Sequence, residues 1–480
     1  MDSLLFLCAR CIIAQRPLPA LPAHLYPVLF QVAFLDRKPL VLRDLVAAWP
    51  FTELNFQWLV GHRELPWDRD CNLCVEAVIQ AVVAQLVEPS LYSSLRILDI
   101  TGLPAGFPSW CSTKALAKAF VEVSRYQQEF PRRRSKRHKG CTGAVTAAPQ
   151  TPGVDVHADL YVYSASYRIL RDALQTGAAD LLRLKCREFK ARNMPASEIV
   201  TLLESLDPSC LRRVDLPFKN LGFTGLSVIL PHLSRFPELR SLRLRDSNVD
   251  LRDLTPQLAS RIRCVARQLG MLPNLRELDL GYSRFSRNLH QILGDLQAPL
   301  ESLELAFCSL VPADLAFLSQ SFHAPALKRL DLSGHDFSQG LLEPLRLLLE
   351  ETSASLLYLD LMFCGMADSH LEALLPTLRR CSRLRYLGLC YNSLSMAALK
   401  DLLQKTLELP DLKLVVYPHP GDCYRLEPSE FGRGFREVVH EELLAAATAE
   451  ISQLLENSGR TDIVWTDNPC SHEALDYFSL

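Results

Sequence analysis

The chain has 480 residues, of which 48% are hydrophobic, 22% charged and 8% aromatic. This composition excludes an intrinsically disordered chain, and the length suits two or three ordinary domains or one elongated array of repeats. A formal net charge of -2 provides no general attraction for nucleic acid or anionic lipid, so we expect no nucleic-acid partner.

The first residues, MDSLLFLCARCIIAQ, predict a helix of the mature protein rather than a secretory signal. Asp2 makes their start acidic, Arg10 interrupts the apolar run, and no small-residue cleavage site follows. No uncharged apolar run in the chain reaches the roughly 18 residues that a membrane-spanning helix needs. The cysteines form no dense framework, and several lie in apolar patterns that predict buried, reduced thiols: Cys8, Cys11, Cys308, Cys364 and Cys390. We therefore expect a cytoplasmic protein without membrane contact.

The same region contains two short apolar motifs. The first comprises Leu4, Cys8 and Ile12, and the second comprises Leu21, Pro22 and Leu25. Steps of four residues place the side chains of the first motif on one helix face, directly after Ser3. Proline in the second motif suits the first turn of a following helix. One explanation is an amphipathic helix that caps the fold, and the other is a docking site for a partner protein.

Residues 95–210 predict irregular early strands that a basic segment interrupts. LRILDI near Leu95, the alternating VDVHADLYVY from Val154 to Tyr163 and the run from Leu181 to Cys186 are typical of strands. The segment 131–153 between them has the composition of a disordered loop and contains six cations, Arg132, Arg133, Arg134, Lys136, Arg137 and Lys139. This cluster is typical of a nuclear-import signal, which would add a nuclear pool, of a contact with an anionic surface, or of a solvated loop.

From residue 211 to residue 417 the phrase L-x-x-L-x-L-x-x-(N/C)-x-L recurs, in a degenerate form at its last copy. Copies start at Leu211, Leu239, Leu275, Leu300, Leu327, Leu356, Leu384 and Leu412, at intervals of 25 to 36 residues. Such intervals are typical of leucine-rich repeats in which a short strand is followed by a full helix. The longest interval, after Leu239, predicts an insertion near residues 251–263 that lengthens a helix or loop.

The predicted fold is therefore α/β, a leucine-rich-repeat solenoid that forms a horseshoe of the ribonuclease-inhibitor type. Parallel strands would line the concave side and helices the convex side, and stacking would supply the stability that one repeat lacks. Residues 1–94 predict a helical N-terminal cap. Residues 418–480 predict a C-terminal cap, with a capping helix at 437–456 and a last short strand at 463–465.

The third and fifth places of each phrase point out of the concave sheet, where a partner would lie. The predicted target-binding residues are Arg213, Asp215, Arg243, Glu277, Asp279, Glu304, Arg329, Asp331, Tyr358, Asp360 and Tyr386. Carboxylates form a column along the fifth place, which Arg243 interrupts. One explanation is charge pairing between polar residues of neighbouring strands. The other is an acidic strip for a basic partner segment, with Tyr358 and Tyr386 as anchors.

No catalytic, metal or cofactor site is expected. Asn or Cys at the ninth place satisfies backbone groups in the turn after the strand, so Cys308 and Cys364 are interpreted as ladder residues. Two C-x-x-C pairs lie about 60 residues apart, too far for a zinc ribbon: Cys8/Cys11 and Cys71/Cys74. The sequence contains no phosphate-binding glycine loop and no H-E-x-x-H, G-x-S-x-G or kinase signature.

Long segments of the chain resemble the PRAME family. LPAHLYPVLFQVAFLDRKPLVLRDLVAAWPFTEL, residues 21–54, is similar to the segment that opens its members. The similarity continues through CLRRVDL, GLSVILPH, APLESLELAFCSL, LKRLDLSG, LRYLGL, NSLSMAALKDLL and the final DYFSL, and so covers nearly the whole chain. The basic segment at 131–153 and the varied ninth places depart from the family pattern.

The resemblance implies a non-enzymatic receptor that brings a target protein to a ubiquitin ligase. The S-L-x-x-x-C-x-x-x-I pattern is similar to the box through which substrate receptors of Cullin-2 ligases hold Elongin B/C. In that resemblance Leu4 fills a pocket on Elongin C, and Leu21, Pro22 and Leu25 face Cullin-2. Family members also restrain inflammatory signalling, which implies the alternative of a scaffold that sequesters a kinase complex of the NF-κB pathway below Toll-like receptors.

Overall fold

The computed structural model describes residues 3–60, 69–87, 94–102, 109–137, 153–175, 181–216, 221–245, 255–284, 287–428, 435–460 and 462–468. Two compact units divide the chain, and each is described by itself. Unit 1 comprises residues 1–216 and 235–239, and unit 2 comprises residues 217–234 and 240–480.

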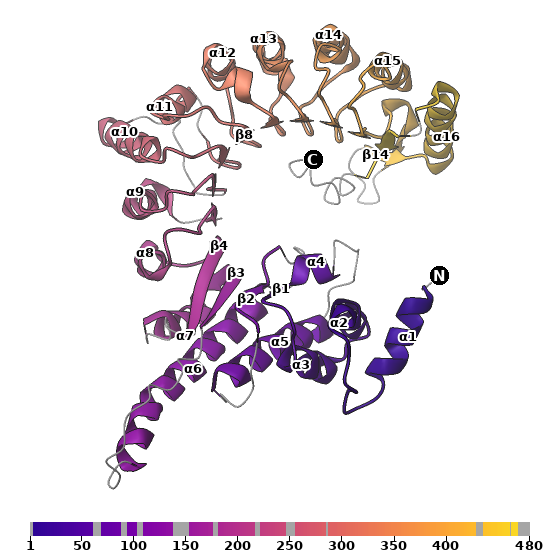
Figure 1. Ribbon diagram of the computed structural model, residues 1–480. Helices are drawn as coiled ribbons and strands as arrows, with labels where there is room; N and C mark the ends of the chain where they lie inside the picture. Colours follow the sequence, from indigo (N-terminus) through magenta and orange to yellow (C-terminus); the bar gives the residue numbers. More distant parts are fainter. Residues whose placement is uncertain are drawn as a thin grey trace. The chain divides into compact units, whose positions relative to one another are not determined.

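Unit 1 combines a group of helices with a parallel sheet (Figure 1). Its strands are β1 (Glu53–Asn55), β2 (Ile97–Asp99), β3 (Val154–Tyr163), β4 (Leu182–Arg192) and β5 (Arg213–Asp215), and they pair in chain order. Its helices are α1 (Leu4–Ile13), α2 (Tyr26–Leu35), α3 (Pro39–Ala47), α4 (Phe56–Val60), α5 (Arg69–Val87), α6 (Ser109–Arg137), α7 (Ser164–Gln175) and α8 (Ala196–Ser205). The structure confirms the three early strands that the sequence predicts at β2, β3 and β4.

Aromatic side chains hold the N-terminal helices of unit 1 together. Phe30 and Phe34 of α2 meet Phe56 of α4 edge to face, at centroid distances of 5.4 and 5.7 Å. Trp49 packs against Phe30 at 5.7 Å and donates its indole N–H to the carbonyl oxygen of Glu53. These rings are buried, and burying a large apolar side chain stabilises a fold by about 1.5–3 kcal/mol. The cluster positions α1, because α1 packs on α2.

Unit 2 is a regular solenoid in which a helix follows each strand between residues 241 and 388. Its parallel strands pair in the order β6 (Ser241–Arg243), β7 (Glu277–Asp279), β8 (Ser302–Glu304), β9 (Arg329–Asp331), β10 (Tyr358–Asp360), β11 (Tyr386–Gly388), β12 (Leu414–Val416) and β15 (Val464–Thr466). The helices are α9 (Gly222–Leu233), α10 (Pro256–Gly270), α11 (Leu289–Leu293), α12 (Pro312–Gln320), α13 (Leu342–Thr352), α14 (Asp368–Leu378), α15 (Met396–Thr406) and α16 (Glu441–Ser458). Within this unit the helices lie outside an inner row of strands, which confirms the predicted leucine-rich-repeat solenoid (Figure 1).

The first, fourth and sixth places of the repeat form the core, as the sequence predicts. In the repeat that starts at Leu300, that residue, Leu303 and Leu305 are each 0% exposed. The corresponding side chains of the other repeats are buried as well. Each repeat leaves this apolar face uncovered until its neighbours stack on it, so the stability of the solenoid depends on the stack.

Ninth-place side chains bond to the turns of neighbouring repeats. The side-chain amide of Asn392 donates to the carbonyl oxygens of Leu361 and Leu389, and its oxygen accepts from the N–H groups of Cys364 and Met366. The thiol of Cys308 donates to Leu280, at 3.2 Å. Burial raises the pKa of Cys308 well above its ordinary value, which keeps this thiol protonated. The interpretation of these cysteines as ladder residues is confirmed.

The long interval after Leu239 corresponds to a long helix. α10 has 15 residues, against 11 in α13, α14 and α15. The predicted insertion near residues 251–263 is therefore confirmed where it is described, while residues 251–254 lie outside the described part.

Asp314 at the start of α12 is buried and accepts backbone N–H groups from Arg287, Leu289 and Val311, which ties one turn to the next helix.

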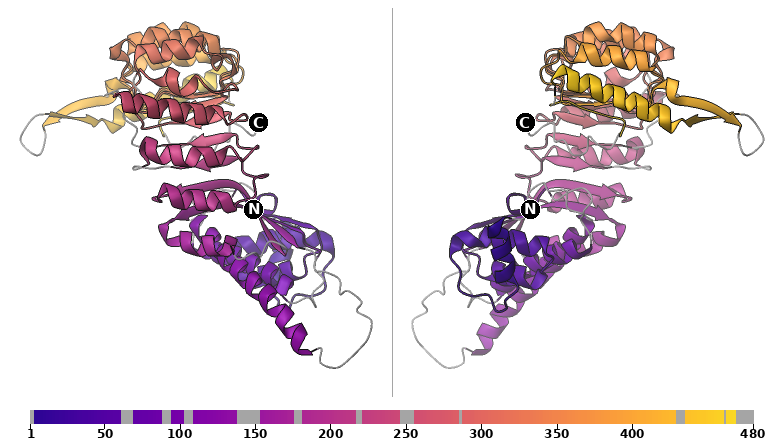
Figure 2. Two further views of the ribbon diagram at one scale, coloured as in Figure 1. Left: turned by 90° about the vertical axis from the view of Figure 1, so that its left-hand side faces the viewer. Right: turned by 90° about the vertical axis from the view of Figure 1, so that its right-hand side faces the viewer.

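The C-terminal part of unit 2 agrees with the predicted cap and adds a hairpin. β15 pairs with β12 as the predicted last strand. The predicted capping helix begins later than expected, because residues up to Val439 belong to β14 (Phe435–Val439), which pairs antiparallel with β13 (Tyr424–Pro428). This hairpin extends beyond the helices and strands of unit 2 (Figure 2).

The basic segment is not a loop throughout, which corrects the expectation for residues 131–153. α6 runs from Ser109 to Arg137, so its last turns contain Arg132, Arg133 and Arg134 as well as Lys136 and Arg137. The side chains of residues 128–137 and all of residues 138–152, Lys139 included, lie outside the described part. Helical periodicity continues past Pro131 because the stretch from 109 to 130 has already formed the helix.

Candidate protein-interaction sites

Helix α1 presents an exposed apolar face formed by the first predicted motif. Ser3 caps the helix by accepting the N–H of Phe6, which fixes its first turn. Leu4 is 77% exposed, and Cys8 is exposed one turn later. Ile12 is half-buried at the end of the same face. Cys8 and Cys11 were expected to be buried, but both are exposed because only the opposite face of α1 packs on the protein.

The opposite face and two ion pairs hold α1 and the following linker in place. Ala9 and Ile13 are buried, at 4% exposure each. Arg10 pairs with Asp36 at the end of α2 at 3.1 Å, and Arg16 pairs with Asp44 of α3 at 2.8 Å. Each ion pair is partly exposed and therefore contributes little stability. Together the two pairs still restrict the orientation of α1 and its linker relative to α2 and α3. The apolar face of α1 is therefore presented by an anchored helix.

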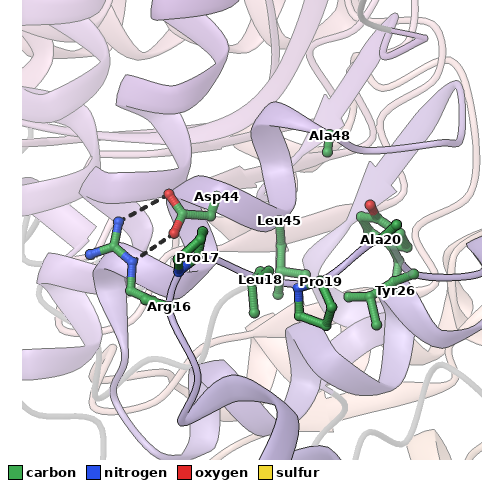
Figure 3. Close-up of a pocket in the computed structure, with 10 residues that line it drawn as sticks. Arg16, Pro17, Leu18, Pro19, Ala20, Tyr26, Asp44, Leu45 and Ala48 are labelled. Carbon is green, nitrogen blue, oxygen red and sulfur yellow. Dashed lines mark hydrogen bonds and ion pairs between the residues drawn. The ribbon is translucent and has the colours of Figure 1, made fainter.

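The second predicted motif lies beside a cleft in unit 1. The linker after α1 and the residues Tyr26, Asp44, Leu45 and Ala48 enclose a cavity of about 600 Å³ (Figure 3). Leu21 lines this cleft, Pro22 is exposed and Leu25 is half-buried. Both predicted motifs therefore reach the surface of unit 1.

Two carboxylates of the concave column in unit 2 form ion pairs with cations of the same chain. Arg245, two residues after β6, pairs with Asp279 and with Glu304, and both carboxylates are buried. Arg329 adds a contact to Glu304 at 3.3 Å. Pairing between neighbouring strands, as the sequence suggests, thus occurs at Glu304 with Arg329, whereas Asp279 pairs with a cation from a turn. Arg245 occupies the seventh place, which the sequence prediction did not include.

The two tyrosines of the predicted target-binding set are buried rather than exposed. Tyr358 and Tyr386 stack at a centroid distance of 4.1 Å and an interplanar angle of 4°. Arg329 lies over the ring of Tyr358 at 4.1 Å. The hydroxyl groups of both tyrosines donate to Asp360, at 3.2 and 3.5 Å. The rings and hydroxyl groups of both tyrosines therefore have their interaction partners within the chain.

The remaining predicted concave residues lie in two places. Arg213 and Asp215 belong to β5 of unit 1, where Arg213 approaches Glu188 at 3.9 Å and Asp215 approaches Lys190 at 4.0 Å. Arg243 and Glu277 are half-buried in β6 and β7 of unit 2. Charge pairing therefore extends to the sheet of unit 1.

Burial and mutual repulsion shift the acidities of the column in unit 2. Burial and the neighbouring Glu304 carboxylate raise the pKa of Asp279 to about 7, against the pull of Arg245. Burial also acts to raise the pKa of Glu304, but the arginines outweigh it and lower that pKa. Burial and Asp360 raise the pKa of Asp331 to about 7, although Ser333 donates two hydrogen bonds to it.

We expect the Asp331→Asn variant to change how stability depends on pH. The folded pKa of about 7 exceeds the unfolded value of about 3.9, so the folded state retains a proton that the unfolded state releases. Stability of the wild type should fall as pH rises from about 4 to 7 and then level off. The variant should be more stable by about 1–2 kcal/mol at pH 8, because an amide oxygen still accepts from Ser333 without a charge.

Urea unfolding of both proteins between pH 5 and pH 8 measures this difference. Glu372→Gln, which neutralises an exposed carboxylate on α14, is the matched control and should leave the pH dependence unchanged. Equal stabilities of Asp331→Asn and wild type at pH 8 would contradict the argument.

The sequence prediction missed a row of exposed aromatic side chains in unit 2. Tyr282, Phe307, Phe363 and Tyr391 occupy the eighth place of their repeats and are 53%, 37%, 48% and 55% exposed. We call these four residues the aromatic row. The signal was present in the sequence as a bulky aromatic residue at the eighth place of four repeats. The repeat pattern predicts exposure only for the third and fifth places of the strands, so it does not identify the eighth place as surface.

No group of three or more His, Cys, Asp or Glu residues suitable for a metal ion occurs among the described residues. The two C-x-x-C pairs are placed differently, since Cys71 and Cys74 are buried while Cys8 and Cys11 are exposed.

Within the described ranges, no helix has the length and apolar character needed to cross a membrane.

Stacked strand-helix repeats with exposed apolar surfaces define a leucine-rich-repeat protein of the protein-binding solenoid class. The model of the PRAME N-terminal domain matches residues 6–107, and that of the PRAME C-terminal domain matches residues 167–479. The chain therefore belongs to the PRAME family.

Relatives of the chain are similar over the whole length. Leucine-rich repeat-containing protein 14 of Xenopus laevis is 42% identical over 510 residues, with 100% of both chains covered. The human and bovine proteins of that name are each 42% identical over 509 residues, again with 100% of both chains covered. An internalin structure from Listeria monocytogenes aligns with 55% of this chain and 81% of that chain, at 14% identity and a TM-score of 0.28.

Proposed function

We propose that the chain is the substrate-recognition subunit of a Cullin-2 ubiquitin ligase and binds Elongin B/C through α1. The observation that carries the proposal is the exposure of Leu4, which leaves 77% of an apolar side chain in water at the start of an anchored helix. Isolated exposed leucines are common, but Leu4 is joined by Leu7, Cys8 and Cys11 on the same exposed side. Such a face favours a partner that covers it.

The second motif supports the same proposal. Pro22 is exposed near a cleft that Leu21 lines, on the linker that follows α1. A cullin bound there would contact the chain close to Elongin, as the family resemblance implies. The solenoid of unit 2 would hold the target protein, so the chain would act by proximity and not by catalysis.

The double variant Leu4→Ala/Cys8→Ala should lose Elongin B/C. Truncation of a central interface residue typically weakens binding by about 2 kcal/mol or more, which is about thirtyfold. The fold should remain intact, because both side chains are exposed. Co-purification of tagged full-length chain with Elongin B/C measures retention, and titration calorimetry measures the affinity.

Leu5→Ala is the matched control for this test. Leu5 is 51% exposed on the same helix, but it is turned by about 100° from Leu4. We expect the control to retain Elongin B/C. Failure of the wild type to bind, or full retention by the double variant, would remove the ligase proposal. The inhibitory scaffold that acts on a kinase complex would then be the remaining candidate.

A further inference from the structure

The aromatic row forms two stacked pairs along the turns that follow the strands of unit 2. The rings of Tyr282 and Phe307 are 5.0 Å apart at an interplanar angle of 12°. Those of Phe363 and Tyr391 are 4.0 Å apart at 11°. Phe307 and Phe363 join the two pairs across the intervening repeat, at 6.0 Å and 52°.

Gly334 makes the row continuous where an aromatic side chain is absent. It occupies the eighth place of the intervening repeat with φ of 76°. A Cβ atom added there would lie 2.2 Å from Cδ1 of Phe307. The ring of Phe307 therefore occupies the space above this glycine and leans toward Phe363. One apolar surface consequently extends over five successive repeats.

The backbone of these turns does not need aromatic side chains. The four residues of the row have φ values between 55° and 61°, a left-handed conformation that favours glycine or asparagine and is uncommon for bulky residues. The eighth-place residues themselves bond to the next turn through backbone atoms, as Phe307 N–H does to Ser333 O and Gly334 N–H to Met362 O, both at 2.8 Å. Large aromatic side chains at positions with this backbone conformation indicate a role in function rather than in stability of the fold.

The charges around the Phe363 end of the row are mainly acidic. Asp336 is exposed in the turn that follows Gly334, and Asp368 is exposed as the first residue of α14. Each caps a backbone N–H, of Ser338 and of Ser395 respectively, and no described cation forms an ion pair with either. The neighbouring strands β9 and β10 add Asp331 and Asp360, which interact electrostatically with Arg329.

We propose that the aromatic row is the surface with which the solenoid holds its target, and that the target segment combines apolar side chains with lysine or arginine. Half-exposed rings offer apolar area, which is large for aromatic residues and marks interaction sites. The exposed carboxylates of Asp336 and Asp368, which follow Gly334 and Phe363 in their repeats, select positive charge. This inference rests on the proposed function in one respect, that unit 2 binds a target protein. It places the contact at the turns, because the carboxylates and tyrosines of the strands are engaged within the chain.

Selection from a phage-displayed library of random 12-residue peptides against the full-length chain tests the proposal. Enriched peptides should combine leucine, phenylalanine or other apolar residues with at least two basic residues. Binding of one such synthetic peptide is then measured by fluorescence polarisation. The double variant Phe363→Asn/Tyr391→Asn should weaken it by about tenfold or more, since loss of central aromatic anchors has effects of this size.

The variants are chosen so that misfolding cannot imitate the result. Asparagine accepts the left-handed conformation, so the double variant should fold as the wild type does. Phe322→Asn is the matched control, because Phe322 has the same 48% exposure as Phe363 but lies outside the row. Phe363→Tyr should retain binding, and Asp336→Lys should weaken peptides that contain lysine or arginine.

Three results would overturn the proposal: no enriched peptide, enrichment of acidic peptides, or equal binding by the wild type and the double asparagine variant. Elongin B/C binding is measured on the same variants. Asparagine substitutions in the row should leave it unchanged, and Leu4→Ala/Cys8→Ala should leave peptide binding unchanged. Loss of the ligase proposal and loss of this inference can therefore be told apart.

Discussion

Asp279→Lys should destabilise unit 2 by about 3 kcal/mol, because it places a second cation at a buried position beside Arg245 and leaves that arginine only Glu304 as an ion-pair partner. The substitution replaces a carboxylate that is 3% exposed with a cation beside Arg245. Arg245 itself is 44% exposed, so we expect the lower end of the usual range. A loss of this size should lower the thermal unfolding midpoint by about 10 °C.

Differential scanning calorimetry of the full-length chain measures this shift. Glu372→Lys introduces the same charge reversal on the exposed side of α14 and should change stability by less than about 0.5 kcal/mol. A midpoint for Asp279→Lys equal to that of the control would show that Arg245 and Asp279 do not depend on each other. Charge reversal in the column is consequently an unsuitable test of target binding, and the aromatic row offers a cleaner one.

Asn392→Ala should have an effect of similar size, about 3–4 kcal/mol, because it leaves several buried backbone groups without their partner. Its side chain makes four hydrogen bonds of 2.7 to 3.0 Å to Leu361, Leu389, Cys364 and Met366. Alanine makes none of these. Urea unfolding measures the loss, and amide hydrogen exchange should locate it at the N–H groups of Cys364 and Met366.

Asn392→Cys separates the hydrogen bonds from the loss of volume. Cysteine at the same place of the neighbouring repeat donates from Cys364 to Leu332 at 3.4 Å, so a thiol can satisfy part of the turn. We expect roughly half the loss of the alanine variant. Ser393→Ala, which changes the adjacent exposed side chain, should be nearly neutral. Equal stabilities for all three variants would show that Asn392 is not a ladder residue.

The two candidate surfaces differ in how far the sequence could predict them. Leu4 and Cys8 share a helix face by local periodicity alone, so their positions on one side of α1 were predictable. Whether that side faces water depended on the burial of Ala9 and Ile13 on the other side of α1, the helix that packs on α2. Exposure of the motif was therefore a tertiary result.

The concave column shows the same limit more clearly. Strand periodicity predicted correctly that Asp279 and Glu304 lie on neighbouring strands in register. It could not predict Arg245, which reaches both carboxylates from a turn and changes an acidic strip into a paired network. Long side chains from adjoining turns follow no period, so no strand pattern reports them.

By itself the sequence determined the solenoid, because a leucine phrase repeated at 25 to 36 residues can bury its apolar side chains only by stacking. It also determined the ladder of ninth-place residues and the presence of a patterned N-terminal helix. Only the tertiary structure decided which side chains remain available to a partner. That choice depends on which charges neutralise each other and which rings stay in water, and both follow from contacts between residues far apart in the chain.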